Sequence, residues 1–286
     1  MAQTTAGKVV HWLPRIVSIP FVAFLLLCCA TGSFGQAPSA RFAPERDLLS
    51  LHYDHAPDKD DGQSAAADRT ILESLFGTEW MKRHVVAVSG AYGLNAGEFN
   101  AGSDRVMDAA WNGAGGWLAG HARRDEVVAE LTRRWLEALE GGGDVWVKEG
   151  GQSDITAAAV RRIQQRAPAL KTGVRIHVVQ HSRWNEEQTT PAALDFTRQN
   201  THYVRIRDAN ASLNVTGGDA SFVEAARRHP VFGAAWRAAF EYYDPADRLD
   251  FSDTGELMHI LGLGEMGIDA VRERFLGAGR PATPPR

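Results

Sequence analysis

Acidic side chains are concentrated in one short stretch, DHAPDKDDGQS, which runs from Asp54 to Ser64 and follows the apolar-rich run DLLSLHY. Carboxylates that stand this close repel one another, so the stretch is either a solvated acidic loop or a set of oxygen ligands for a bound cation. An EF-hand fits poorly, because its central glycine and its closing glutamate are missing from the required positions. The aspartates concerned are Asp54, Asp58, Asp60 and Asp61.

Other polar residues that could bind a ligand follow apolar runs further along the chain. Each of them also has a simple structural explanation. The segment EGGQSD reads equally well as a glycine turn with a helix cap, and Asp253 as a helix N-cap. His181 could be a satisfied histidine at a strand end, and Trp184 could belong to the core. The candidates are Asn95, Glu149, Gln152, Gln180, His181, Trp184, Asn185 and Asp253.

The segments that must position these residues alternate between two patterns. Apolar runs rich in β-formers predict strands near 47–53, 84–90, 144–151, 174–181 and 202–208. Helical spacing of apolar residues predicts helices near 64–76, 123–143, 154–165 and 190–200, followed by a mainly helical C-terminal part. Alternation of this kind indicates βαβ units. We therefore expect an α/β fold, with one domain from 44 to 278 and an open, mostly parallel sheet covered by helices on both faces.

The expected sheet also predicts where the polar residues meet. Open parallel sheets bind ligands outside the carboxyl ends of their strands. The aspartate stretch follows the first expected strand, EGGQSD follows the third, and QHSRWNEE follows the fourth. The stretch 91–122 is long for a connection between strand and helix, and such long connections are often functional. The polar groups are therefore predicted to gather at one edge of the sheet.

The N-terminal segment has the composition of a secretory signal. Lys8 and Arg15 precede the apolar run IVSIPFVAFLLL, and small residues before Gln36 offer a cleavage site. An uncleaved anchor is one alternative, although the apolar run is shorter than the roughly 20 residues of a membrane span. Lipidation at Cys28 or Cys29 is another. We expect a signal peptide at 1–35, a linker at 36–43 and a disordered tail at 279–286, and a secreted or periplasmic mature protein.

Composition excludes several classes of function. The only 2 cysteines lie in the N-terminal segment, so a mature chain has no disulfide, zinc–thiolate site or cysteine nucleophile. The net charge of −4 leaves no electrostatic footprint for nucleic acid and no polybasic patch for a stable membrane partner. The expected partner is a small molecule, and a homo-oligomer is compatible with the sequence.

The order of these motifs resembles the nucleoside hydrolase-like superfamily, and most closely its branch of secreted, poorly characterised sugar-binding or hydrolase-like proteins. That branch has an aspartate after a strand and then an aspartate pair, as Asp54 and Asp60–Asp61 are here. A serine follows three residues after the pair, as Ser64 does. An aspartate at a helix start near the C-terminus, here Asp253, closes the metal site in that branch.

Two later motifs of that branch are present with changes. A strand that ends in a Trp-Gly-Gly-like turn matches VWVKEGGQSD, with Glu149 in place of the tryptophan. A strand that ends in Gln-Asp matches IHVVQHS, with His181 in place of the acid. The matches span 54 to 253, which is nearly the whole expected mature chain.

The resemblance implies a secreted, metal-dependent hydrolase of N- or O-glycosidic bonds that acts on a ribonucleoside or sugar. Ca²⁺ would take oxygen ligands from Asp54, Asp61, Asp253 and the Gly150–Gln152 turn. Asp54 or Asp60 would deprotonate the attacking water, and His181 would protonate the leaving group. The substrate contacts would be hydroxyl recognition by Asn95, Gln180 and Asn185, stacking on Trp184, and a contact from Glu149.

Two other classes remain compatible with the sequence. One is a non-catalytic carbohydrate- or nucleoside-binding protein on the same scaffold, although binding alone does not need the full set of aspartates. The other is a metal-dependent phosphoesterase-like enzyme, whose usual cues are a P-loop or a His/Asp pair at metal-ligand spacing. Neither cue is clear in the sequence.

Overall fold

The computed structural model describes residues 40–277, which belong to one compact unit. The expected signal peptide (1–35), the first part of the expected linker (36–43) and the expected tail (279–286) lie outside the described residues. Within 40–277, no helix is both long enough and apolar enough to cross a membrane.

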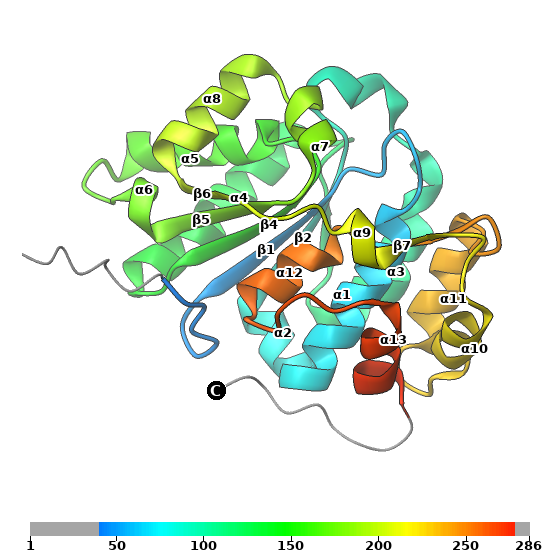
Figure 1. Ribbon diagram of the computed structural model, residues 1–286. Coiled ribbons are helices and arrows are strands. Elements are labelled where there is room, and N and C mark those ends of the chain that lie inside the picture. Colours follow the sequence, from blue (N-terminus) through cyan, green and yellow to red (C-terminus); the bar gives the residue numbers. More distant parts are fainter. Residues whose placement is uncertain (1–39, 278–286) are drawn as a thin grey trace, which may run out of the picture. The chain divides into compact units, whose positions relative to one another are not determined.

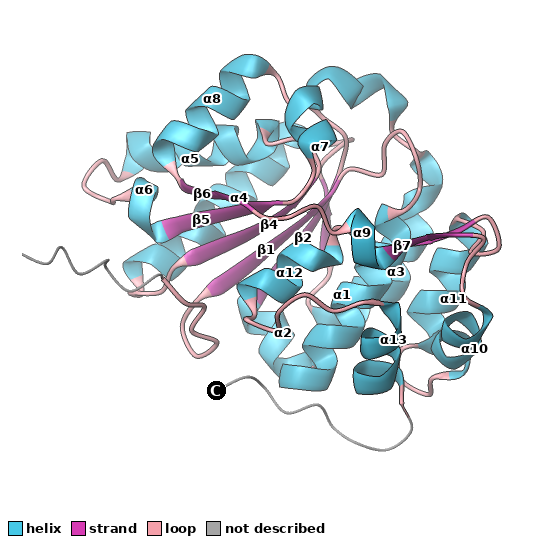
Figure 2. Cartoon of the chain, in the orientation of Figure 1, coloured by secondary structure: helices cyan, strands magenta, loops and turns pink. Residues whose placement is uncertain are grey.

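A sheet of six parallel strands lies between two layers of helices (Figures 1 and 2). The strand order is β3-β2-β1-β4-β5-β6, so the predicted α/β fold with an open parallel sheet is confirmed. The strands are β1 (Leu48–Tyr53), β2 (Val85–Ser89), β3 (Trp117–Ala119), β4 (Val145–Gly150), β5 (Ile176–Gln180) and β6 (His202–Arg205).

The strand order reverses between β1 and β4. The chain adds β2 and β3 on one side of β1 and then returns to add β4, β5 and β6 on the other side. Tyr53, the last residue of β1, pairs with Gly150, the last residue of β4. A crevice opens at such a reversal, because the connections after the two strands leave in opposite directions. The residues that follow β1 and β4 therefore stand at the expected ligand-binding position of the sheet.

Helices cover both faces of the sheet, and the alternation of side chains along each strand decides which face a residue joins. Leu49, Leu51 and Tyr53 of β1 pack in the hydrophobic cluster that includes α1 (Asp61–Phe76) and α11 (Gly233–Tyr242). Leu48 of the same strand packs in the cluster that includes α4 (Arg124–Glu140) and α5 (Asp154–Arg166). The helices are α1 (Asp61–Phe76), α2 (Thr78–His84), α3 (Asp104–Trp111), α4 (Arg124–Glu140), α5 (Asp154–Arg166), α6 (Thr172–Arg175), α7 (Arg183–Gln188), α8 (Pro191–Asn200), α9 (Asn210–Leu213), α10 (Ala220–Arg228), α11 (Gly233–Tyr242), α12 (Thr254–Ile260) and α13 (Ile268–Val271).

The C-terminal part is mainly helical, as expected, but it also contains a small second sheet. Strands β7 (Asn214–Thr216) and β8 (Arg248–Asp250) pair in antiparallel fashion. β8 leads directly into the turn before α12, so this sheet places Asp250 and Asp253 opposite the carboxyl end of β1. The long stretch 91–122 contains α3 and the edge strand β3.

Candidate active site

A cavity of about 330 Å³ lies at the reversal point of the sheet, where the segments after β1, β4 and β5 meet the turn before α12. Its lining contains all four aspartates of the acidic stretch, together with two more from the C-terminal part. The polar residues that line it are Asp54, Asp58, Asp60, Asp61, His181, Ser182, Asn185, Asn210, Asn214, Arg248, Asp250, Ser252 and Asp253.

The acidic stretch is folded back onto the protein instead of extending into solvent. Asp54 and Asp61 are almost completely buried, with 5% and 1% of their surface exposed, whereas Asp58 is exposed. Asp61 Oδ2 accepts a hydrogen bond from the backbone N–H of His55 at 2.6 Å. Asp54 Oδ1 accepts one from the backbone N–H of Ala56 at 3.0 Å. These bonds hold the carboxylates of Asp54 and Asp61 in place. Neither side chain therefore belongs to a solvated loop.

The helix α1 begins within the same stretch because Asp60 serves as its N-cap. Asp60 Oδ1 accepts a hydrogen bond from the backbone N–H of Asp61 at 2.9 Å. Asp60 itself is half-buried and faces the cavity. One aspartate thus caps the helix while the next, in its first turn, is directed toward the carboxylates of the site.

Burial makes these carboxyl groups weaker acids than exposed ones. Burial raises the pKa of Asp54 to about 7, and the charge of Asp253 adds to the effect. Burial and then the charge of Asp54 raise the pKa of Asp61 well above its ordinary value. Burial also raises the pKa of Asp250, to about 6. Carboxylates crowded in a poorly hydrated site hold protons more tightly, since each ionised group opposes the ionisation of the next.

The pKa of Asp253 is shifted in the opposite direction. Burial by itself raises its pKa, but the hydrogen bond from His181 and the charge of Lys148 outweigh burial and lower the pKa below its ordinary value. His181 Nε2 lies 2.9 Å from Asp253 Oδ1. Burial lowers the pKa of His181, yet the bond to Asp253 raises it to about 9. The pair is therefore ionised at neutral pH, beside carboxyl groups that retain protons.

A buried lysine lies under the cavity and was not singled out in the sequence. Lys148 of β4 is fully buried, and its Nζ lies 3.4 Å from Asp68 Oδ2 of α1. The charges of Asp253 and Asp61 also act on it. The sequence did contain a sign of this buried lysine, because Lys148 interrupts an otherwise apolar stretch of the central strand VWVKEG. Glu256 was missed as well, although it stands three residues after Asp253 on α12.

Two predicted substrate contacts line the cavity from α7. Trp184 is 41% exposed, which makes it one of the few large apolar side chains with an open surface. Asn185 is buried, and its backbone N–H is held by Ser182 Oγ at 3.2 Å, the N-cap bond of α7. Both line the same cavity as the aspartates.

The other predicted contacts lie behind the lining of the cavity. Glu149 is fully buried and accepts hydrogen bonds from Thr156 and from the ring of His52, on the face of α5. Gln152 donates to Asp54 Oδ2. Gln180 donates to the carbonyl oxygens of Glu149 and Gly151, at 2.6 and 3.2 Å.

Gln152 and Gln180 therefore support the turn after β4. Asn95 is also buried and stands outside the cavity lining, in the connection after β2. The roles of these four residues in binding stay predictions.

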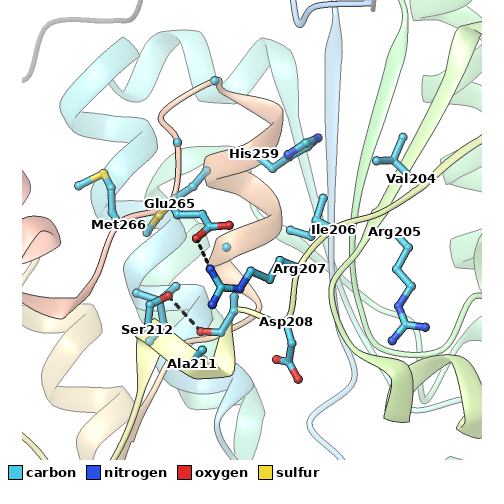
Figure 3. A pocket seen from close by; sticks show the side chains of 16 residues that line it. Val204, Arg205, Ile206, Arg207, Asp208, Ala211, Ser212, His259, Glu265 and Met266 are labelled. Atoms are coloured by element: carbon cyan, nitrogen blue, oxygen red, sulfur yellow. Dashed lines mark hydrogen bonds and ion pairs between the residues drawn. The ribbon is translucent and has the colours of Figure 1, made fainter.

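A larger hollow of about 660 Å³ lies between β6, α9 and the end of α12 (Figure 3). Its lining is mainly apolar, and its charged side chains include Arg207 and Glu265, which pair at 3.2 Å. The buried carboxyl groups line the smaller cavity instead. The candidate chemistry therefore belongs to the smaller cavity.

The donors at the smaller cavity include carboxylate oxygens of the type that binds cations. Asp61 Oδ1 is buried and has no hydrogen-bond partner among residues 40–277, so one carboxylate oxygen remains free to bind. Burial and the charge of Asp253 raise the pKa of Asp54 and Asp61, so the three carboxyl groups lie close enough to affect one another. Their oxygens are the donor type that Ca²⁺ prefers.

The arrangement as a whole can carry out acid–base chemistry. It joins carboxyl groups of raised pKa, an ionised His–Asp pair, and a wall with an aromatic side chain and amides. A scan against protein-family models, a search of curated proteins and a search of solved structures each found no match for the chain.

Proposed function

We propose that the protein hydrolyses the glycosidic bond of a small sugar or ribonucleoside in the acidic cavity, on a nucleoside hydrolase-like scaffold. One observation carries the proposal: Asp54, Asp61 and Asp253, from opposite ends of the described chain, meet at the reversal point of a parallel sheet. Paired carboxyl groups are the usual groups for this reaction, because one can activate water while others stabilise an oxocarbenium-like transition state.

Asp54 is the best candidate for the base. Burial raises its pKa to about 7, so the carboxylate accepts a proton readily near neutral pH. Asp60, half-buried at the cavity, is the second candidate. Both fit the expectation from the sequence that one of these two aspartates deprotonates the attacking water.

His181 is the candidate acid. Its ring lines the cavity, and Asp253 holds it in the protonated form at neutral pH. A protonated imidazole can donate to the leaving group as the glycosidic bond breaks. Trp184 would stack on the substrate, and Asn185 would bind its hydroxyl groups.

A calcium-type cation belongs to this proposal. Asp54, Asp61 and Asp253 would hold it, with backbone oxygen from the turn after β4. When bound, it supplies a Lewis acid that lowers the pKa of water and orients hydroxyl groups. The cavity of about 330 Å³ is at the lower end of the roughly 300–1,000 Å³ typical of small-molecule sites. A single sugar or nucleoside matches that size.

The test is turnover of a panel of ribonucleosides and aryl glycosides, with Ca²⁺ and with a chelator. Asp54→Asn should lower kcat by about 10²–10⁴-fold, the usual contribution of a general base. Asp61→Asn should weaken Ca²⁺ binding. Asp247→Asn, an exposed aspartate outside the cavity lining, is the matched control and should behave as the wild type.

The same experiment separates the rival functions. Saturable sugar binding without turnover by any substrate would favour a non-catalytic binding protein. Release of phosphate from phosphate esters would favour the phosphoesterase reading. Unchanged Ca²⁺ affinity in both Asp61→Asn and Asp253→Asn would remove the proposed cation site.

The proposed location follows from the N-terminal segment. We propose that residues 1–35 are removed as a signal peptide and that the enzyme acts in the periplasm or outside the cell. Expression of the full chain in a secreting host, followed by N-terminal sequencing, should show Gln36 as the first residue. A cell-associated product that still begins at Met1 would contradict it.

A further inference from the structure

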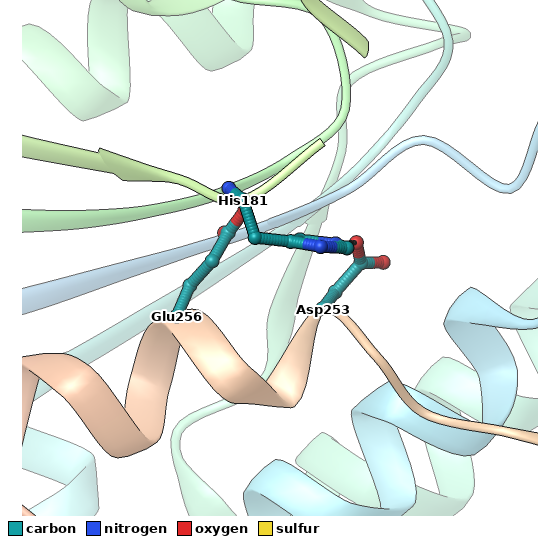
Figure 4. A group of neighbouring side chains, drawn as sticks. All are labelled: His181, Asp253 and Glu256. Carbon is teal, nitrogen blue, oxygen red and sulfur yellow. Dashed lines mark hydrogen bonds and ion pairs between the residues drawn. The ribbon is translucent and has the colours of Figure 1, made fainter. Parts of the chain in front are cut away.

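One nitrogen donor and two carboxylates meet beside the acidic cavity. His181 follows β5, while Asp253 and Glu256 stand three residues apart at the start of α12 and so lie on one side of that helix. One donor atom from each lies within 4.8 Å of the other two. Figure 4 shows the ring of His181 directed at the carboxylate of Asp253, with Glu256 one helical turn away.

Glu256 has an unsatisfied oxygen. Its side chain is fully buried, and Oε1 accepts a hydrogen bond from the backbone N–H of His181 at 2.9 Å. Oε2 is buried and has no hydrogen-bond partner within residues 40–277. A buried carboxylate oxygen without a partner is costly, and a cation is the partner that satisfies it best.

The histidine is supported as metal ligands usually are. Its second nitrogen, Nδ1, lies 3.4 Å from Asp208 Oδ1 and accepts a hydrogen bond from the backbone N–H of Ala209 at 3.3 Å. A bound ion would replace the proton on Nε2, which lies 2.9 Å from Asp253 Oδ1, and Nδ1 would then carry the hydrogen and donate to Asp208. A carboxylate behind the ring is the common arrangement of metal-binding histidines, because it fixes the tautomer and the ring orientation.

A bound ion would keep the charge that Asp253 already faces. Lys148 is a buried positive group below the cavity, and it is paired with Asp68 at 3.4 Å. The positive partner of Asp253 is His181, 2.9 Å away, and a cation bound to both residues would take the place of the proton between them. His181 and Asp253 line the cavity, so an ion can reach them from solvent.

We propose that His181, Asp253 and Glu256 bind a divalent transition-metal ion of the Zn²⁺ or Mn²⁺ type, at a site separate from the calcium-type set. The mixture of nitrogen and oxygen donors suits such ions, whereas Ca²⁺ takes oxygen ligands only. Three protein ligands leave a coordination position open, as in catalytic zinc sites. The inference does not depend on glycosidase activity, and with the ion bound His181 is a ligand and not the general acid of the proposed reaction.

Asp253 would be shared between the two sites. Its Oδ1 faces His181 at 2.9 Å. Its Oδ2 lies on the other side, beside the turn after β4, where a Cβ atom on Gly150 would stand 3.2 Å away. One carboxylate can thus present one oxygen to each ion, which is how two-metal sites are commonly joined.

The experiment titrates the full chain, first stripped of metal with a chelator, with Co²⁺ followed by visible absorption and separately with Ca²⁺. The wild type should bind one Co²⁺ per chain that Zn²⁺ displaces and excess Ca²⁺ does not. His181→Gln and Glu256→Gln should abolish that signal. Asp208→Asn, an exposed second partner of the histidine, should weaken Co²⁺ binding by roughly 10–100-fold.

Two matched variants separate this site from the rest of the protein. Glu137→Gln, on the exposed side of α4, should bind Co²⁺ as the wild type does. Asp61→Asn should retain Co²⁺ binding, so that loss of the calcium-type site is distinguished from loss of this one.

Unchanged Co²⁺ binding in His181→Gln and Asp208→Asn would overturn the proposal, and so would displacement of Co²⁺ by Ca²⁺. Since Asp208 is largely exposed, Asp208→Asn remains informative even where Glu256→Gln fails to fold.

Discussion

Lys148 Nζ lies 3.4 Å from Asp68 Oδ2, and both side chains are completely excluded from solvent. Tyr53 covers the pair: its hydroxyl donates to Asp68 at 2.7 Å, and the centre of its ring lies 4.0 Å from Nζ. The pair joins β4 to α1 directly below the acidic cavity. A permanent positive charge is thereby fixed beneath carboxylates that come from three other segments.

We predict that Lys148→Met destabilises the fold by about 3–5 kcal/mol, because it leaves Asp68 buried without a counter-charge. Lys148→Met combined with Asp68→Asn should recover much of this loss. Urea denaturation of the two single variants and the double variant measures the coupling. Additive losses in the double variant would show that the pair is not coupled. Lys82→Met, which removes an exposed ion pair with Glu79, should unfold at the wild-type urea concentration.

Gly150→Ala should disturb both the sheet and the site. A Cβ atom at this position would stand 2.6 Å from the carbonyl oxygen of His52 and 2.8 Å from Lys148 Nζ. The backbone oxygen cannot move without breaking the β1–β4 pairing, so we expect a loss of about 1–3 kcal/mol, typical of overpacking. Thermal denaturation checks this value. At Gly97 an added Cβ meets nothing within 4 Å, so Gly97→Ala is the control, and equal losses in both variants would refute the steric explanation.

His177 should make the folded protein sensitive to mild acid. Its ring stacks on Trp146 with centroids 3.9 Å apart, and Nε2 lies 3.0 Å from Asp144 Oδ2. Burial lowers the pKa of His177 below its ordinary value, although Asp144 opposes the shift. The unfolded chain therefore binds this proton more tightly, so stability falls as the pH drops below about 6.5.

The measurement is the urea midpoint from pH 8 to pH 5 in the wild type and in His177→Gln. The difference in urea midpoint between the two proteins should become smaller as the pH falls through about 6.5, since only the wild type loses stability by protonation of His177. A gap that widens on acidification would mean that the folded protein favours the charged imidazole.

Trp184→Ala should weaken ligand binding and leave stability unchanged. The indole is 41% exposed and lines the cavity, so its removal deletes a stacking surface and little core. A ring contact of about 1.4 kcal/mol corresponds to a tenfold rise in KM or Kd. Leu94→Ala, which truncates a more exposed apolar side chain outside the cavity lining, is the control. An unchanged Kd in Trp184→Ala would assign recognition to other residues.

The sheet was predictable because its central strands are apolar runs separated by helices and turn signals. The five expected strands correspond to β1, β2, β4, β5 and β6. The sixth, β3, was not predicted. It has only three residues, Trp117–Ala119, all partly exposed at the sheet edge, and it follows a glycine-rich segment that hides any alternation.

Asp54, Asp61, His181 and Asp253 lie around one cavity at the carboxyl end of the sheet, as the order of the motifs predicted, while their roles stay predictions. Glu149 shows where the prediction of position failed. Position after a strand was used as the criterion, but the alternation of side chains directs Glu149 toward α5, where it bonds to His52 at 2.9 Å. The neighbouring Lys148 points to the opposite face and lies below the cavity.

Buried pairs such as Lys148 with Asp68 depend on contacts between distant segments. A single sequence reports that a charge stands in an apolar strand, but the partner follows only from the packing of α1 on β4. The same holds for Glu256, whose buried oxygen becomes informative only once His181 is placed beside it.

The turn before α12 completes the cavity from the far end of the chain. Thr254 Oγ1 donates to the carbonyl oxygen of Ser64 across 190 positions. During synthesis, Asp54 and Asp61 leave the ribosome long before Asp253 and Glu256 exist, and contacts between such distant positions form slowly. If the proposed cation sites are correct, cation binding would report that folding has reached completion, because a chain that stops before residue 253 encodes every strand of the large sheet and lacks one wall of the cavity.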